Sequence, residues 1–314
     1  MTIAVKIARS SKPTPDYQDE LHAEVLDDLQ IGEHGYKYRL VDGIVMPPYI
    51  TPSQYHLSRT IETRASDICG TSYPKSGTNW MSNILVRLTN GGEAPADRTL
   101  RDSLHWVESS LYYPRSRAEL AAAPSPRIFS SHMPFHMALG GDPLSNPCRY
   151  VYIARNPKDV AVSYYHFESG QSWSGNYNGS WSHWLQMFVD GKLQRGDWFD
   201  HVLSWWRHRD ADNVHFMKYE DLRNDFDGEL RRLGGFLGYD LSDETVRVIR
   251  ERTGFGNMKQ DSFSDMHELK ALRNFFRKGV VGSWKERFTV AESEWFDEVY
   301  RERMQGSGLD FEFV

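Results

Sequence analysis

The stretch Thr71-Ser72-Tyr73-Pro74-Lys75-Ser76-Gly77-Thr78-Asn79-Trp80 decides the fold of this chain. A short apolar run precedes it and an amphipathic segment, Met81 to Leu88, follows it, so the sequence predicts a strand, a tight loop and a helix. The N-terminus of such a helix presents backbone N–H groups that have no partner within the helix, and these groups bind anions. Lys75 adds a positive charge, and Thr78 and Asn79 add short polar side chains. The stretch therefore predicts a phosphate-binding loop that resembles a P-loop.

The loop differs, however, from the Walker A loop of ATP-binding proteins, which ends in Gly-Lys-Ser/Thr. Here Lys75 stands two residues before Gly77, the only glycine of the loop. This order argues against a nucleotide kinase that binds ATP and magnesium. Taken alone, the stretch also fits an ordinary turn that caps a helix, so the rest of the chain has to decide between these interpretations.

The composition is that of a globular protein. The chain has 314 residues, of which 39% are hydrophobic and 25% are charged. No break in composition divides it, so we expect a single domain over residues 1–314, with residues 1–45 as an N-terminal extension that packs on it. The formal net charge of −6 argues against binding to nucleic acid or to an anionic membrane.

Several kinds of site and location are also disfavoured. Cys69 and Cys148, the two cysteines, provide neither a disulfide framework nor the spacing of metal ligands. Residues 1–10 lack the apolar core of a signal peptide, and no stretch approaches the ~20 apolar residues of a membrane span. We therefore expect a cytoplasmic protein without a metal site.

Short strands alternate with helices along most of the chain. The patterns predict strands at 67–72, 127–131, 149–154 and 214–218, and helices at 79–88, 157–167, 197–209, 223–237 and 242–252. This alternation predicts an α/β fold with a central, mostly parallel sheet flanked by helices. Ligands of such folds bind at the carboxyl ends of the strands, where the Lys75 loop would lie. The segment 170–182 fits either a surface loop or a mobile lid.

Two further segments carry basic residues next to structural breaks. Arg155-Asn156-Pro157-Lys158-Asp159-Val160-Ala161-Val162-Ser163 follows a predicted strand and opens a helix, which places Arg155 to bind a phosphate. Arg277-Lys278-Gly279-Val280-Val281-Gly282-Ser283-Trp284-Lys285 joins two cations to paired glycines, with Phe275 and Phe276 just before it. This second segment suits another phosphate and a stacked base. Each segment alone also fits a charged surface.

Together, the three segments resemble those of the cytosolic sulfotransferase family in sequence, order and spacing, and the resemblance extends from near Leu40 to the C-terminus. It implies that the Lys75 loop holds the 5′-phosphosulfate of 3′-phosphoadenosine 5′-phosphosulfate (PAPS) and that the other two segments hold the 3′-phosphate. The implied activity is in-line transfer of the sulfuryl group to a hydroxyl or amine of a small acceptor. The many aromatic residues favour an aromatic or apolar acceptor. The alternatives are a relative that binds the nucleotide with weak or no catalysis, and sulfation as a step toward elimination of water.

The resemblance also implies roles for single residues. His132, in Ser130-Ser131-His132-Met133-Pro134, matches the catalytic base, Lys75 would neutralise the leaving group, and Ser163 would hold Lys75 back until the acceptor arrives. Trp80 and Phe255 would sandwich the adenine, while Pro74, His132 and Phe167 would contact the acceptor. The implied nucleotide-binding set is Lys75, Ser76, Gly77, Thr78, Asn79, Trp80, Arg155, Ser163, Tyr219, Thr253, Phe255, Met258, Phe276, Arg277, Lys278 and Gly279.

The chain departs from the family pattern at three positions. Ser130 replaces a lysine, Asn79 replaces a threonine, and Ser283 replaces an aspartate. Without the lysine at position 130, Lys75 would be the main cation at the sulfuryl group that is transferred.

A last motif concerns assembly. Lys285, Thr289, Val290 and Glu294 match the family's dimer motif, which implies a homodimer. The same stretch also fits a plain helix start, because Thr289 and the glutamate three residues later form a capping box.

Overall fold

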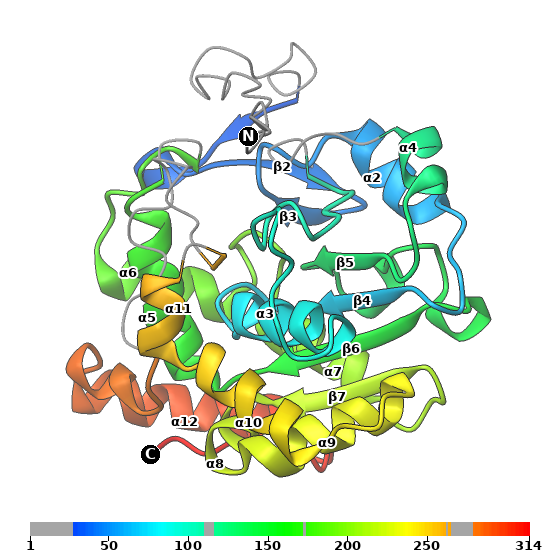
Figure 1. The fold of residues 1–314 in the computed structure, drawn as a ribbon. Coiled ribbons are helices and arrows are strands. Elements are labelled where there is room, and N and C mark those ends of the chain that lie inside the picture. The colour runs from blue at the N-terminus through cyan, green and yellow to red at the C-terminus, as the bar shows by residue number, and fades with distance from the viewer. Residues whose placement is uncertain (1–27, 110–115, 172–173, 262, 265–278) are drawn as a thin grey trace, which may run out of the picture.

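A four-stranded parallel sheet forms the centre of the molecule (Figure 1). The computed structural model describes residues 28–109, 116–171, 174–261, 263–264 and 279–314. The strands lie in the order β5 (Ile128–Ser131), β4 (Ile68–Thr71), β6 (Arg149–Ala154) and β7 (Val214–Lys218), and all three pairings are parallel. The predicted α/β fold with a central parallel sheet is therefore confirmed.

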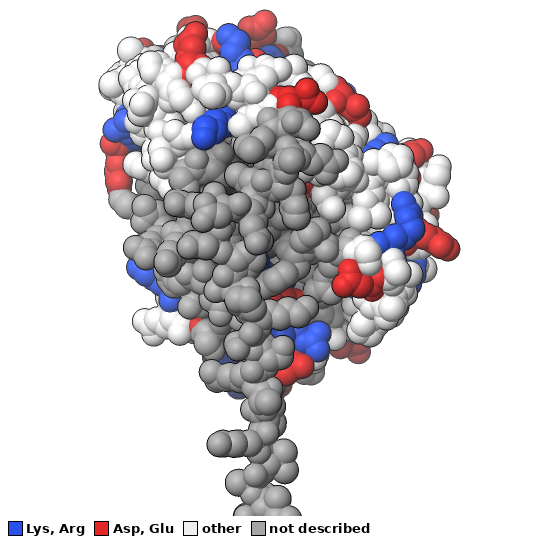
Figure 2. All heavy atoms as spheres, turned by 90° about the horizontal axis from the view of Figure 1, so that it is seen from above, with Lys and Arg blue, Asp and Glu red and all other residues white. Residues whose placement is uncertain are grey.

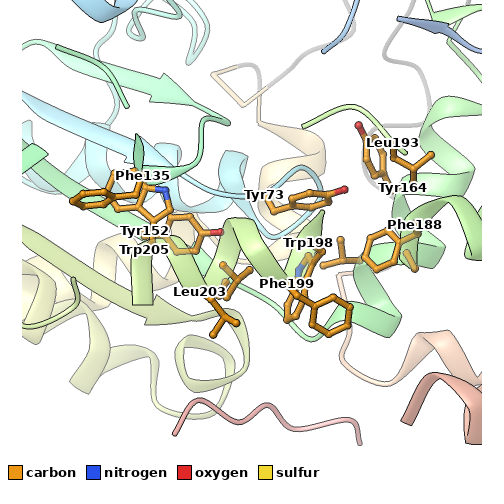
Figure 3. Packing of buried hydrophobic residues seen from close by; sticks show 14 of the residues in the cluster. Tyr73, Phe135, Tyr152, Tyr164, Phe188, Leu193, Trp198, Phe199, Leu203 and Trp205 are labelled. Atoms are coloured by element: carbon orange, nitrogen blue, oxygen red, sulfur yellow. The ribbon is translucent and has the colours of Figure 1, made fainter. Parts of the chain in front are cut away.

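Both faces of this sheet are apolar. Successive residues of a strand point to opposite sides of the sheet, and apolar residues occupy both sets of positions. On β6, Val151 and Ile153 belong to one buried cluster, and Tyr150 and Tyr152 belong to another. The first cluster includes residues of α3 (Thr78–Thr89), α9 (Phe226–Leu237) and α10 (Asp243–Arg252). The second includes residues of α5 (Pro157–Glu168), α6 (Trp181–Val189), α7 (Trp198–Trp206) and α12 (Val290–Met304). Figure 3 shows part of this second cluster, with Tyr152 and Trp205 side by side.

Most predicted elements lie where expected, but some differ. The helix predicted at 223–237 is two helices, α8 (Tyr219–Asn224) and α9, because Asp225 leaves helical geometry and its side chain accepts the N–H of Gly228 to start α9. A helix, α2 (Pro52–Thr60), precedes β4, and the helices outside the predicted ranges are α4 (Arg117–Ala122), α6 and α11 (Phe255–Gln260). The described part of the chain also contains short 3-10 helices at Glu33–Gly35, Phe135–Met137, Pro143–Ser145 and Ser283–Glu286.

The N-terminal segment is more ordered than its polar sequence indicates. A small antiparallel sheet forms from β1 (Gln30–Ile31), β2 (Lys37–Val41) and β3 (Ile44–Met46). It packs on the residues before α7, where the N–H of Gln194 donates to Tyr36 Oη over 2.9 Å and the N–H of Arg195 donates to the carbonyl of Val45 over 2.7 Å. Residues 1–27 of the predicted extension lie outside the described residues.

The segment 170–182 packs against this N-terminal sheet over the part that the structure describes. Gln171, Ser174 and Tyr177 are buried, and the N–H of Asn178 donates to the carbonyl of His34. These contacts tie part of the segment to the N-terminal region, and a surface loop and a lid both stay predictions. In Figure 2 the described surface carries acidic and basic side chains side by side. No helix among the described residues is long and apolar enough to cross a membrane.

Candidate active site

The carboxyl ends of the four parallel strands bring the predicted site segments to one edge of the sheet. β5 leads directly to His132, β4 to the Lys75 loop, β6 to Arg155 and β7 to Tyr219. The register places these ends level, since Thr71 of β4 pairs with Ser131 of β5. In the strand order, His132 therefore neighbours the Lys75 loop on one side, and Arg155 and Tyr219 follow on the other.

The Lys75 loop makes a tight turn into α3. Lys75 has φ 68° and Gly77, the residue before the helix, has φ 114°. A Cβ atom at Gly77 would lie 2.9 Å from Cδ2 of Tyr219, so both the conformation and the space require glycine. The hydroxyl groups of Ser72 and Thr78 lie 2.6 Å apart and close the turn.

Several buried polar atoms around this loop have no hydrogen-bond partner among the described residues. They are Ser76 Oγ, Asn79 Nδ2, Trp80 Nε1 and Arg155 Nε. Buried polar groups are almost always hydrogen-bonded in folded proteins, so four such atoms at one edge indicate a missing ligand. A ligand with several acceptor oxygens, such as a phosphate ester, would satisfy all four. The residues present therefore fit an anionic nucleotide.

Arg155 connects its own segment, at the start of α5, to the described part of the C-terminal segment 277–285. Its guanidinium lies 3.3 Å from the Asp159 carboxylate, donates to the carbonyl of Val280 over 2.7 Å, and covers the Tyr219 ring at 4.4 Å. Asp159 in turn accepts the backbone N–H groups of Gly282 and Trp284, each over 2.9 Å. The hydroxyl of Ser283 donates to the same carboxylate over 3.0 Å, so this replacement of the usual aspartate still contributes to the anchor.

Aromatic side chains continue the site from the loop toward the C-terminal region. Trp80 lies 5.2 Å from Tyr219 and stacks on Phe226 at 6.0 Å between ring centroids. Tyr219 Oη donates to the carbonyl of Gly279 over 3.1 Å. A Cβ atom at Gly279 would lie 2.3 Å from Cδ2 of Phe255, so the Phe255 ring rests directly on this glycine. These contacts join four of the predicted nucleotide-binding residues.

Further members of the predicted set lie at the end of α10, in α11 and after it. Met258 is buried in α11, and Thr253 ends α10 with its hydroxyl donating to the carbonyl of Ile249 over 2.8 Å. Because that bond occupies the hydroxyl proton, Thr253 is left with acceptor capacity toward a nucleotide. Phe276, Arg277 and Lys278 lie outside the described residues.

His132 is fixed in one orientation by the loop of the neighbouring strand. Its Nδ1 lies 2.8 Å from the carbonyl oxygen of Ser72, and its backbone N–H donates to Oε1 of Glu108 over 3.2 Å. A carbonyl can only accept, so Nδ1 carries the proton and the Nε2 lone pair is left for another donor. Burial, together with the positive charge of Arg195, lowers the pKa of His132 well below its usual value. The imidazole is therefore neutral near pH 7 and able to take a proton.

Lys75 extends toward α5. Its Nζ lies 4.1 Å from the ring centroid of Phe167. Ser163 stands four residues before Phe167 on this helix, so both side chains project from the same face. This brings Lys75 to the helix face that carries Ser163. Pro74, the neighbouring residue in the loop, is buried.

Ser130, where the family usually has lysine, is buried in β5. Its hydroxyl side chain brings no charge to the site, and its backbone N–H donates to the carbonyl of His105. Lys75 is therefore the cation that the loop itself provides at this edge of the sheet.

Sequence reasoning missed the residues that support this site from a distance. Ser72 and Glu108 orient His132, Phe226 stacks on Trp80, and Asp159 anchors the C-terminal region. A signal existed for Ser72 and Asp159, which lie inside the quoted motifs. Glu108 and Phe226 carry no such signal, because their roles arise only from tertiary contacts.

A model of the sulfotransferase domain matches residues 65–308. The chain is 32% identical to human sulfotransferase 1C2 over 284 residues, covering 88% of this chain and 95% of that protein. The chain belongs to the sulfotransferase family. It is also 36% identical to mouse sulfotransferase 1B1 over 260 residues, covering 80% of this chain and 86% of that protein.

Solved sulfotransferases share the fold. The mouse sulfotransferase SULT7A1, solved in complex with PAP, superposes with a TM-score of 0.72 at 31% identity, over 86% of this chain and 95% of that one. A retinol dehydratase, solved with androsterone and PAP, has a TM-score of 0.74 at 21% identity over 90% and 91% of the two chains, which supports the fold alone. The family resemblance stated from the sequence is thus confirmed, and the protein is an enzyme of the sulfotransferase class.

Proposed function

We propose that this sulfotransferase moves the sulfuryl group of PAPS to a hydroxyl or amine of a small acceptor. The observation that carries the proposal is the set of unsatisfied buried donors at two neighbouring strand ends, Ser76, Asn79 and Trp80 at β4 and Arg155 at β6. Two anion-binding regions suit a nucleotide that is phosphorylated at both its 5′ and 3′ positions. The bound product PAP in the related mouse SULT7A1 supports the same choice.

In this proposal the Lys75 loop holds the 5′-phosphosulfate, and Arg155 holds the 3′-phosphate together with the C-terminal segment 277–279. Trp80, Tyr219 and Phe255 flank the adenine, while Thr253 and Met258 border it. PAPS supplies the activated sulfuryl group. No step requires a metal ion from this chain.

His132 serves as the base. Because Ser72 holds the proton on Nδ1, Nε2 accepts the proton of the acceptor as the acceptor attacks sulfur. Lys75 and the loop N–H groups neutralise the charge that develops on the bridging oxygen of the leaving nucleotide. Ser163 restrains Lys75 until the acceptor is in place. Positioning and electrostatics account for the rate, as in phosphoryl transfer.

Three further assignments complete the proposal. The acceptor contacts Pro74, Phe167 and His132, which border Lys75. The protein acts in the cytoplasm. It forms a homodimer through the motif of Lys285, Thr289, Val290 and Glu294, all exposed, with Val290 at 75% exposure. Thr289 also caps α12 in the predicted capping box, which is confirmed.

A thermal-shift comparison tests the nucleotide. Binding to the native state raises the melting temperature, so PAP should stabilise the protein strongly while ATP with magnesium should not. Stabilisation by ATP with magnesium but not by PAP would refute the proposal. A related protein that binds the nucleotide without catalysis is the second candidate, favoured by Ser130, and it predicts PAP binding without sulfate transfer to any acceptor.

A further inference from the structure

Arg195 occupies an unusual place beside the catalytic edge. It lies in the turn before α7 with φ 77°, and its N–H donates to the carbonyl of Val45 in β3. The carbonyl of the next residue, Gly196, accepts the hydroxyl of Tyr73 over 3.1 Å, and Tyr73 begins the Lys75 loop. Figure 3 shows Tyr73 close to Tyr164 and Leu193, the residue two positions before Arg195. The position of Arg195 is therefore coupled directly to the nucleotide loop.

The guanidinium of Arg195 is buried with poor partners. The side chain is 2% exposed, its Nη1 lies 3.6 Å from Met46 Sδ and 3.5 Å from Met133 Sδ, and its Nη2 has no hydrogen-bond partner. Throughout the described ranges, no carboxylate lies within ion-pair distance of it. Thioether sulfur is a weak acceptor, and although the Tyr49 side chain hydrogen-bonds to Arg195, Nη2 is left as a buried donor without a hydrogen bond among the described residues. A ligand that brings an anionic acceptor to Nη2 would complete the hydrogen bonds of this guanidinium.

The groups around Arg195 place it on the acceptor side of the site. Met133 directly follows His132, and the Arg195 charge is the second cause of the lowered His132 pKa after burial. The Tyr49 hydroxyl lies against Arg195, which opposes the effect of burial on the tyrosine pKa. Glu108 accepts the backbone N–H of His132 through its carboxyl group. The positive charge of Arg195 also acts to lower the pKa of this carboxyl group, but burial has the larger effect and raises it. The guanidinium of Arg195 therefore lies near His132 and Glu108, on the side of the site that holds the proposed base.

We propose that Arg195 binds an anionic group, a carboxylate, on the acceptor, so that the enzyme prefers phenols or alcohols that carry a negative charge. The inference rests on the proposed function and narrows its acceptor class. The planar guanidinium with a free Nη2 matches a carboxylate, which can accept two hydrogen bonds from an arginine. A charge-assisted bond to a desolvated carboxylate adds discrimination against neutral analogues, because a neutral acceptor such as an amide carbonyl bonds more weakly to the guanidinium.

The test compares two acceptors that differ only in charge, 4-hydroxyphenylacetate and 4-hydroxyphenylacetamide. For the native enzyme we expect kcat/KM to be higher for the carboxylate by about tenfold or more, the usual range for a hydrogen bond to a charged group. Arg195→Met should collapse this ratio toward one, and Arg195→Lys should retain part of it. Arg207→Met removes an exposed arginine that ends α7 and should leave the ratio as in the native enzyme.

Equilibrium binding separates this inference from the proposed function. Titration of each acceptor into the PAP-saturated protein by calorimetry should show tighter binding of the carboxylate, lost in Arg195→Met. Sulfation of the amide at a rate equal to the carboxylate, with equal binding, would overturn the role of Arg195 while leaving the sulfotransferase activity intact. A carboxylate preference that survives in folded Arg195→Met, judged by its melting temperature, would overturn it as well.

Discussion

Nδ1 of His132 lies 2.8 Å from the backbone carbonyl oxygen of Ser72. This contact joins the end of β5 to the end of β4, so a hydrogen bond between adjacent strands ties the proposed base to the Lys75 loop. Its consequence is chemical, because it fixes the tautomer in which Nε2 lacks a proton. The loop that would bind the donor therefore also prepares the base.

Replacement of His132 by alanine tests the base directly. We expect His132→Ala to lower kcat by roughly 10²–10⁴-fold, the usual contribution of a general base, while the affinity for PAP changes little. Steady-state sulfate transfer and calorimetry with PAP measure the two quantities. His136→Ala removes an exposed histidine four residues away and should leave both quantities as in the native enzyme. Full activity of His132→Ala would refute the assignment.

The pH dependence of kcat/KM gives a second test of the same residue. The neutral imidazole is the active form, and burial lowers the pKa of His132, so activity should be lost only as pH falls below the usual range of histidine near 6.5. We expect a flat profile from pH 8 to 6 and an acid limb at lower pH. An acid limb centred above pH 7 would contradict the lowered pKa.

Much of this arrangement follows from local patterns in the sequence. The apolar runs at Arg149–Ala154 and Val214–Lys218 form strands as predicted, and parallel strand ends necessarily meet at one edge, which brings His132, the Lys75 loop and Arg155 together. The supporting contacts do not follow, because they join residues far apart in the chain. Glu108 bonds to His132 across 24 positions, and no local rule connects them.

Helix α6 was not predicted from the sequence, for a related reason. Trp181–Val189 is a good amphipathic helix started by Ser180, yet it follows a Gly- and Ser-rich stretch that suggests a continuing loop. Trp184 packs against Tyr164 of α5 and Phe188 packs against Tyr73, and this tertiary packing, which is invisible in the sequence, stabilises the helix.

Gly77→Ala tests the shape of the nucleotide loop. The new methyl group would lie 2.9 Å from the Tyr219 ring, at a backbone conformation that costs other residues about 1–3 kcal/mol. We expect PAP affinity to fall by about tenfold or more, measured by calorimetry. Gly91→Ala is the matched control, since Gly91 also has positive φ, 69°, but no atom within 4 Å of a Cβ. Equal PAP affinity in both variants would show that contact between a methyl group at position 77 and the Tyr219 ring does not disturb the loop.

Asp159→Asn tests the anchor of the C-terminal region. The carboxylate accepts the N–H groups of Gly282 and Trp284 and pairs with Arg155, and an amide would present a donor to one of them. Breaking a buried charge network costs about 3–5 kcal/mol, so we expect a large loss of unfolding free energy together with weaker PAP binding. Chemical denaturation and calorimetry measure these changes.

The control for this variant is Asp97→Asn, which removes an exposed carboxylate paired only with its neighbour Arg98 among the described residues. Its unfolding free energy should stay within about 0.5 kcal/mol of the native value. A fully stable Asp159→Asn protein with native PAP affinity would mean that residues 280–284 hold their place without this carboxylate.

Glu168 makes stability depend on pH. Its carboxyl group is fully buried at the end of α5, near the Ser174 hydroxyl, and burial raises the pKa of this group to about 8. The unfolded chain releases the proton near pH 4.5, so between that pH and 8 the folded state binds more protons and loses stability as pH rises. Glu168→Gln keeps the shape and removes this titration. We therefore expect the melting temperature of the variant, relative to the native protein, to rise by a few degrees from pH 5 to pH 8, whereas Glu298→Gln, an exposed change, should show no such trend. A constant difference between the variant and the native protein at both pH values would mean that Glu168 is ionised in the folded state, with Lys75 as the nearby charge that lowers its pKa.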